Sequence, residues 1–188
     1  MKKIIIIGAG AMGSAFAVPC LENKNEVTLV GTHLEDELIN NIQLNNNFHP
    51  ALNIKLPSNL KVEKYDKLKS ILEGGIDIIV AGVSSVGIEW FVKQITKSYK
   101  KNTPIILLTK GLAIEDNELI TLSDKIKKLL KDQGHTDVNI SAIKGPCLAA
   151  GLAYKMRTGT VIANPDIKET EKLKKIISTD YYSTEVSD

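Results

Sequence analysis

Short apolar runs alternate along the chain with longer segments in which apolar residues recur every three or four positions. The runs are typical of strands buried on both faces of a parallel sheet, and the periodic segments are typical of helices with one apolar face. The predicted strands cover residues 4–7, 26–31, 76–83, 104–109, 138–143 and 159–163. The predicted helices cover residues 34–42, 68–72, 88–95, 119–130 and 167–177. This alternation predicts an α/β fold with a doubly wound, mostly parallel sheet.

One stretch interrupts the alternation. Residues 45–58 are rich in asparagine and are broken by Pro50 and Pro57, which predicts a loop rather than a long element. His49 lies in this loop and His135 lies in another polar segment. We expect both histidines at the surface.

Composition narrows the class of protein. The chain has 188 residues, enough for one domain with a full core, which we expect to span residues 1–188. Lys and Arg number 24 and Asp and Glu number 22, and a net charge of +2 argues against nucleic acid or an anionic membrane surface as partner. No apolar run is long enough for a membrane span. Cys20 and Cys147 lack metal-ligand spacing, so we expect no metal and free thiols in a cytoplasmic protein.

The first predicted strand runs directly into a glycine turn, Gly8-Ala9-Gly10-Ala11-Met12-Gly13. This spacing matches the fingerprint of a Rossmann-like dinucleotide-binding fold. Gly8 permits the tight turn, Gly10 lets the backbone approach a pyrophosphate, and Gly13 lets the next helix pack on the strand. The start of that helix, with Ala11 and Met12, offers unpaired N–H groups to an anion. The turn therefore predicts a site for NAD or NADP.

Several polar groups follow predicted strands at their carboxyl ends, where doubly wound sheets bind ligands. They are Gly8–Gly13, Gly31-Thr32-His33, Val83-Ser84-Ser85, Thr109-Lys110-Gly111 and Lys144-Gly145-Pro146-Cys147. We expect all five to converge on one edge of the sheet. Ser84 and Ser85 have no histidine partner in a recognisable motif, so we expect no serine nucleophile. We expect Trp90 to pack inside the protein rather than to stack on a ligand.

Lys110 is the strongest candidate for chemistry, because it follows a buried strand directly and precedes Gly111. At that point a lysine can polarise a carbonyl, bind an alkoxide or hold a phosphate. The alternative is a solvated surface lysine, but the position and the glycine favour a site. Gly145-Pro146 opens a second glycine turn, which is either an oxygen-binding loop or an ordinary strand-to-helix connection.

The end of the second predicted strand bears on the choice of cofactor. An Asp or Glu there would hold the ribose hydroxyls of NAD, but this chain has Thr32 and His33. Without a carboxylate at the tip a 2′-phosphate is not repelled, and both side chains can hydrogen-bond it, which favours NADPH. Thr32 and Glu35 also fit a capping box for the following helix, and the two interpretations are compatible.

The order of these motifs resembles that of NAD(P)-dependent sn-glycerol-3-phosphate dehydrogenases, along nearly the whole chain. The residues that carry the resemblance are Gly8–Ala15, Val83-Ser84-Ser85, Leu108-Thr109-Lys110-Gly111-Leu112 and Gly145-Pro146-Cys147-Leu148-Ala149. The resemblance implies an oxidoreductase that transfers a hydride between NAD(P)H and dihydroxyacetone phosphate, giving glycerol 3-phosphate for phospholipid synthesis.

The resemblance also implies residue roles. Lys110 would be a catalytic residue in contact with substrate and cofactor. Gly145 and Cys147 would line the substrate site, Ser84 would contact the cofactor, and Ala149 would lie against the nicotinamide.

The chain departs from the family at three points. Cys147 stands where the family usually has Ser or Thr, and Ala11 and Met12 replace a polar–aromatic pair. The family's helical domain, with its proton-donating lysine and its ligands for the substrate phosphate, is absent from this chain. We therefore expect the cofactor-binding portion of a longer, homo-oligomeric enzyme, inactive by itself.

Two alternatives stay open. One is a ketopantoate-type reductase, which shares the start of the glycine turn but explains the Lys110 and Gly145 segments less well. The other is a module that binds NAD(P) and does no chemistry.

Overall fold

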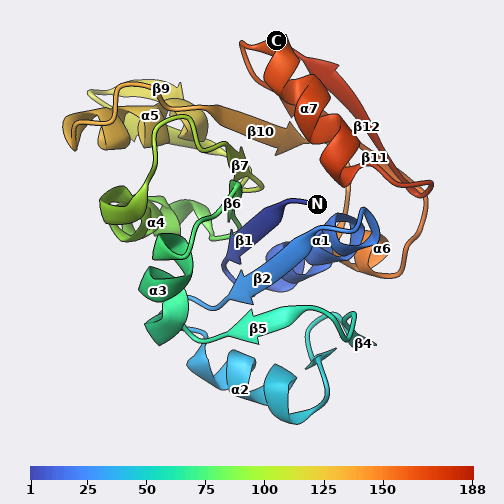
Figure 1. The fold of residues 1–188 in the computed structure, drawn as a ribbon. Coiled ribbons are helices and arrows are strands. Elements are labelled where there is room, and N and C mark those ends of the chain that lie inside the picture. Colours follow the sequence, from blue (N-terminus) through green and yellow to red (C-terminus); the bar gives the residue numbers. More distant parts are fainter.

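One eight-stranded sheet organises the molecule, with helices on both of its faces (Figure 1). The computed structural model describes all 188 residues. The strand order is β12-β11-β10-β7-β6-β1-β2-β5. The strands are β1 (Lys3–Ile7), β2 (Glu26–Val30), β5 (Lys61–Glu63), β6 (Ile78–Ala81), β7 (Ile105–Leu107), β10 (Ile140–Lys144), β11 (Thr158–Ala163) and β12 (Tyr182–Ser187).

The central part of this sheet is parallel. All pairings from β5 through β2, β1, β6 and β7 to β10 are parallel, which is the strand order of dinucleotide-binding folds. Only β11 runs antiparallel to its neighbour β10, and β12 is parallel to β11. The prediction of a doubly wound, mostly parallel sheet is confirmed.

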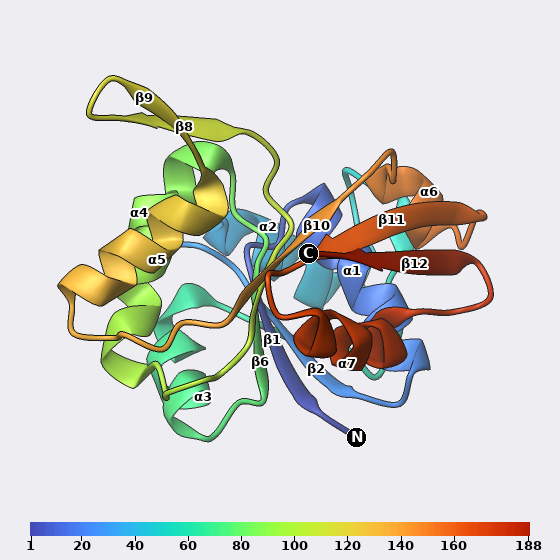
Figure 2. The same cartoon turned by 90° about the horizontal axis from the view of Figure 1, so that it is seen from above.

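The sheet separates two apolar cores. Side chains alternate along β1, so Ile4 and Ile6 enter one core whereas Ile5 and Ile7 enter the other. The first core is covered by α1 (Ala11–Glu22), α2 (Asp36–Leu44), α6 (Ala149–Ala153) and α7 (Ile167–Ile177). The second is covered by α3 (Leu68–Glu73), α4 (Ile88–Ile95) and α5 (Leu122–Asp132). Figure 2 shows α3, α4 and α5 on one side of the sheet and α1 and α7 on the other. No helix is both long enough and apolar enough to cross a membrane.

The predicted helix over 119–130 starts too early. Leu119 belongs to a two-stranded hairpin of β8 (Leu112–Glu115) and β9 (Glu118–Thr121), and α5 begins only at Leu122. Asp116 and Asn117 form the turn with φ of 49° and 66°, a conformation that favours hairpins. The Thr121 hydroxyl then accepts a hydrogen bond from the Asp124 N–H and caps α5.

The asparagine-rich loop also contains more structure than predicted. It holds the antiparallel pair β3 (Phe48–His49) and β4 (Ile54–Lys55). The surface prediction for His49 is wrong, because the ring is completely buried. His135 is half-buried rather than exposed: it packs edge-on against Tyr99 and its Nε2 lies 3.0 Å from the Thr96 carbonyl oxygen.

Candidate functional site

A cavity of about 540 Å³ lies at the carboxyl ends of β1, β2 and β6, the size of a cofactor site. It is lined by six of the residues that the sequence assigns to a cofactor, namely Gly10, Ala11, Met12, Thr32, His33 and Ser84. The remaining lining residues are Leu34, Glu35, Gly82, Val83, Val86, Gly87 and Trp90. The predicted convergence of these strand ends on one edge is therefore present.

The glycine turn has a separate steric reason for each glycine. Gly8 has φ of +109°, and a Cβ there would lie 2.7 Å from the carbonyl group of Gly82. A Cβ on Gly13 would lie 2.1 Å from the Gly8 carbonyl oxygen, so only glycine lets α1 start this close to β1. At Gly10 the nearest atom is 3.8 Å away, a side-chain oxygen of Glu35. The backbone at Gly10 is therefore open to a ligand, as a pyrophosphate requires.

The N-terminus of α1 faces this opening. Gly10 is the N-cap residue and has no side chain to cap the helix, and the first turn contains no acidic residue. The first N–H groups of a helix lack intrahelical acceptors and carry the positive end of its dipole. The residues present therefore fit the pyrophosphate of a dinucleotide.

A carboxylate does lie at the tip of β2, which corrects the premise behind the NADPH preference. Glu35 Oε2 accepts hydrogen bonds from the Thr32 N–H at 2.7 Å and from the Ala9 N–H at 3.0 Å. The predicted capping box is only half formed: α2 starts at Asp36 with Glu35 as its N-cap residue, and the Thr32 hydroxyl accepts a weak bond from the Leu34 N–H at 3.4 Å. The sequence indicated Glu35 only as a capping residue and not as a carboxylate of the site, because it lies beyond the strand end, in the turn.

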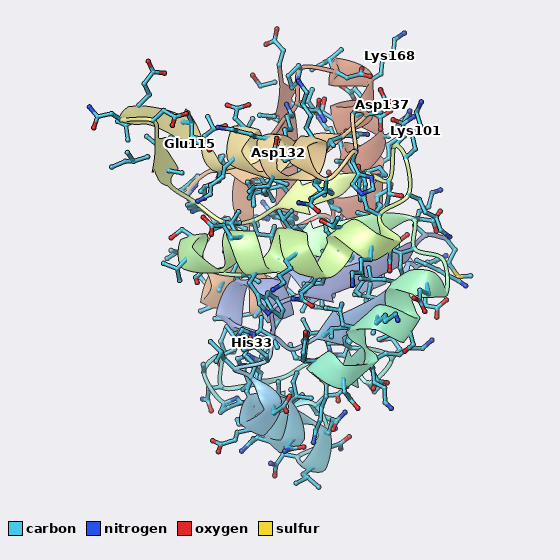
Figure 3. All side chains as sticks on the ribbon, turned by 90° about the vertical axis from the view of Figure 1, so that its left-hand side faces the viewer. His33, Lys101, Glu115, Asp132, Asp137 and Lys168 are labelled. Carbon is cyan, nitrogen blue, oxygen red and sulfur yellow. The ribbon has the colours of Figure 1, made fainter.

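An aromatic cluster closes one side of the cavity. The His33 ring lies 5.0 Å from the Trp90 ring and 6.2 Å from the Tyr65 ring, measured between centroids. His33 lies between α2 and α4 in Figure 3. Trp90 packs on these rings, but it is only half-buried and also lines the cavity, so the expectation that it packs rather than contacts a ligand stays a prediction.

Two lysines connect the ends of β7 and β10 through hydrogen bonds. Lys110 Nζ donates to the Gly145 carbonyl oxygen at 2.7 Å, and Lys144 Nζ donates to the Thr109 carbonyl oxygen at 2.5 Å. Neither ammonium takes part in any ion pair. Burial and, secondarily, the Lys110 charge lower the pKa of Lys144 below its usual range. This edge therefore carries positive charge without an acidic partner. Lys144 contributes to that charge, although the sequence motifs did not assign it a role.

The second glycine turn, at Gly145-Pro146, places the predicted substrate residues beside the first glycine turn, Gly8–Gly13. A small cavity of about 20 Å³ is lined by Met12, Lys110, Gly145 and Cys147, together with residues of β10, β11 and β12. Gly145 has φ of +138°, and a Cβ there would lie 3.2 Å from Thr160 Cα, so the turn requires glycine. Cys147 is buried, and burial raises the pKa of its thiol.

Ala149 and Ser84 occupy different surroundings. Ala149 begins α6 and packs against the core beneath α1. Ser84 is exposed and precedes the short 3-10 helix Ser85–Gly87 on the rim of the larger cavity. The contacts of both residues with a cofactor stay predictions.

A second cavity, of about 320 Å³, lies at the opposite edge of the sheet. It is lined by Lys3, Glu26, Lys61 and neighbouring residues at the amino ends of β1, β2 and β5. Parallel α/β sheets bind their ligands at the carboxyl ends of the strands. We therefore assign no function to this cavity.

The strand order and the glycine turn together define a dinucleotide-binding domain of the Rossmann class. Comparison with known families makes the assignment specific. Residues 3–170 match the profile described as the NAD-dependent glycerol-3-phosphate dehydrogenase N-terminus, and the chain belongs to this family. The family predicted from the motifs is confirmed.

Individual relatives support the same family assignment. The NADP(+)-dependent glycerol-3-phosphate dehydrogenase of Archaeoglobus fulgidus is 34% identical over 98% of this chain and 53% of its own length. The NAD(P)+ glycerol-3-phosphate dehydrogenase of Mesoplasma florum is 30% identical over 96% of this chain and 52% of its own. The crystal structure of glycerol-3-phosphate dehydrogenase from Coxiella burnetii has the same fold, with a TM-score of 0.84 at 22% identity, over 100% of this chain and 54% of its own. The chain spans about half the length of these relatives.

Proposed function

We propose that the chain is the dinucleotide-binding half of an NAD(P)-dependent glycerol-3-phosphate dehydrogenase. The reaction is hydride transfer between NAD(P)H and dihydroxyacetone phosphate, which yields sn-glycerol 3-phosphate for glycerophospholipid synthesis. The family match over residues 3–170 carries this proposal, and the glycine turn and Lys110 on one edge of the sheet support it. The ketopantoate-type alternative has no comparable support.

The cavity residues divide the binding of the cofactor between them. The N–H groups at Gly10, Ala11 and Met12 bind the pyrophosphate, since these residues line the cavity, the turn is open at Gly10 and no side chain caps the helix. Gly13 serves the site by letting α1 start close to β1. Thr32 and His33 line the part that receives the adenosine half, and Ser84 lines the same cavity. When bound, the dihydronicotinamide supplies the hydride.

Lys110 acts on the substrate. An ammonium group has three N–H donors, and the Gly145 carbonyl accepts only one of them. The other two are free to donate to the substrate carbonyl oxygen, where negative charge develops as the hydride arrives. Tethering to Gly145 fixes the ammonium in place before the substrate binds, which avoids reorganisation during the reaction.

The positive edge suits a phosphorylated substrate. Lys110 and Lys144 lie there without acidic partners, and Gly145 and Cys147 complete the wall. The free thiols of Cys20 and Cys147 fit a reducing compartment, so we place the enzyme in the cytoplasm. Homo-oligomerisation of the full-length enzyme is part of the same proposal.

The test is steady-state kinetics on a full-length enzyme that contains this half. Lys110→Ala is expected to lower kcat/KM for dihydroxyacetone phosphate by about 100-fold or more, the scale of losing one oxyanion donor. Lys93→Ala is the matched control, because Lys93 is exposed on α4 and forms no ion pair. Near-normal activity of Lys110→Ala would show that Lys110 is an ordinary surface lysine without a role in the reaction. Turnover of ketopantoate in place of dihydroxyacetone phosphate would overturn the proposed substrate.

A further inference from the structure

Ala9, in the middle of the glycine turn, is completely buried, and both of its backbone polar groups are bound by side chains. Its carbonyl oxygen accepts from the Ser14 hydroxyl at 2.9 Å and from His49 Nε2 at 3.0 Å. Its N–H donates to Glu35 Oε2 at 3.0 Å. The three side chains come from α1, from β3 and from the turn after β2, so three separate segments meet on one residue.

The tautomer of His49 follows from its second partner. The Leu52 N–H donates to His49 Nδ1 at 3.2 Å, so Nδ1 carries a lone pair and the proton lies on Nε2. Nε2–H therefore donates to the Ala9 carbonyl. The ring is buried in the asparagine-rich segment, and the neighbouring Leu52 and Leu56 belong to the same apolar core as Ala9. The β3–β4 hairpin thus presents a neutral imidazole to the turn.

These contacts decide where the next N–H group points. In a planar trans peptide the C=O and the following N–H point in opposite directions. Ser14 and His49 hold the Ala9 carbonyl in the interior, so the Gly10 N–H is directed away from it, and Gly10 lines the large cavity. The Gly10 N–H has no acceptor within the protein. Glu35 fixes the preceding peptide plane and ties it to Thr32.

We propose that Ser14, Glu35 and His49 are positioning residues that hold the glycine turn in its anion-binding conformation before any cofactor arrives. This Ala9 clamp rests on the proposed dinucleotide function and adds a role for the β3–β4 hairpin, which lies outside the glycine motif. Its physical basis is preorganisation: a turn that is already ordered loses less conformational freedom on binding.

Two substitutions at His49 separate the clamp from ordinary packing. His49→Gln keeps a donor near the position of Nε2, whereas His49→Asn keeps only an acceptor near Nδ1 for Leu52. Ser14→Ala is a milder variant that removes the other donor to Ala9. His135→Asn is the matched control, because His135 also binds a backbone carbonyl, that of Thr96, away from the cavity.

The measurement is calorimetric titration of the 188-residue chain with NADPH, NADH and ADP-ribose, with thermal unfolding recorded for each variant. His49→Asn and Ser14→Ala are each expected to raise Kd about five- to tenfold for all three ligands, the scale of one neutral hydrogen bond. His49→Gln and His135→Asn are expected to stay within about twofold of the unmodified chain on the same scale. Equal Kd values for folded His49→Asn and the unmodified chain, or equal losses for Asn and Gln, would overturn the clamp.

Amide hydrogen exchange in the ligand-free chain gives an independent readout. Residues 8–13 are expected to exchange faster in His49→Asn than in the unmodified chain, and unchanged in His135→Asn. Equal exchange in all three proteins would contradict the clamp. If the unmodified chain bound no dinucleotide, the proposed function would fail, and the exchange rates would still decide whether the clamp exists.

Discussion

After the end of β2, three side chains line the cavity: Thr32, His33 and Glu35. The carboxylate of Glu35 is engaged by two backbone N–H groups, and the one at Ala9 belongs to the glycine turn. Thr32 and His33 follow Gly31 after the strand, and both side chains can hydrogen-bond a ligand. The preference between NADH and NADPH therefore depends on which groups contact the adenine ribose more strongly: Thr32 and His33, or the Glu35 carboxylate.

We predict that the chain binds NADPH at least as tightly as NADH. Because Glu35 is turned toward the glycine turn, Thr32 and His33 are left to receive a 2′-phosphate. Thr32→Asp should then weaken NADPH more than NADH, by charge repulsion. Parallel calorimetric titrations decide the matter, and NADH binding more than about tenfold tighter, or 1.4 kcal/mol, would reverse the assignment.

Among the elements, local pattern predicted most helices and central strands, because their apolar spacing is set by the faces they bury. The four isoleucines of β1 and the apolar stripe of α4 are examples. It failed at β8–β9, where Leu119 falls in step with the stripe of α5 although the Asp116-Asn117 turn makes a hairpin. It also missed β12, an edge strand whose pattern alternates without a long apolar run.

The candidate site, like the fold, contains features that local sequence predicts and features that it does not. The glycine turn and Lys110 could be predicted because strand, turn and chemistry are adjacent in sequence. The contact of His49 with Ala9 could not, because 40 residues separate the two and nothing in the intervening segment marks the histidine as buried. Glu35 was visible only as a capping residue, and its bond to Ala9 depends on how the turn after β2 folds back.

The junction of β1 and α1 yields a prediction about stability. Gly13→Ala should destabilise the chain by about 1–3 kcal/mol, because its Cβ would overlap the Gly8 carbonyl oxygen and force the backbone to shift. Gly151→Ala is the control, since a Cβ there meets nothing within 4 Å and alanine favours the helix by up to about 1 kcal/mol. Urea unfolding measures both. Equal stabilities for the two variants would show that α1 does not need glycine at this contact.

At the scale of the whole molecule, every cofactor element predicted from the motifs follows a strand of one sheet, and the chain spans about half the length of its relatives. Binding requires only the cavity at the strand ends. Turnover also requires a residue that transfers a proton to the substrate oxygen, and Lys110 is assigned only a stabilising hydrogen bond to that oxygen. We therefore predict that the 188-residue chain binds NAD(P)H without oxidising it in the presence of dihydroxyacetone phosphate. Oxidation of NADPH within about tenfold of the rate of a full-length relative would show that the chain carries its own acid.

The decisive experiment is calorimetric titration of the 188-residue chain with NADPH. We predict saturable binding at one site per chain, competed by ADP-ribose and weakened in Gly13→Ala, because the opening of the glycine turn at the start of α1 forms the anion site. Absence of saturable binding to NADPH and NADH by the folded chain would contradict it.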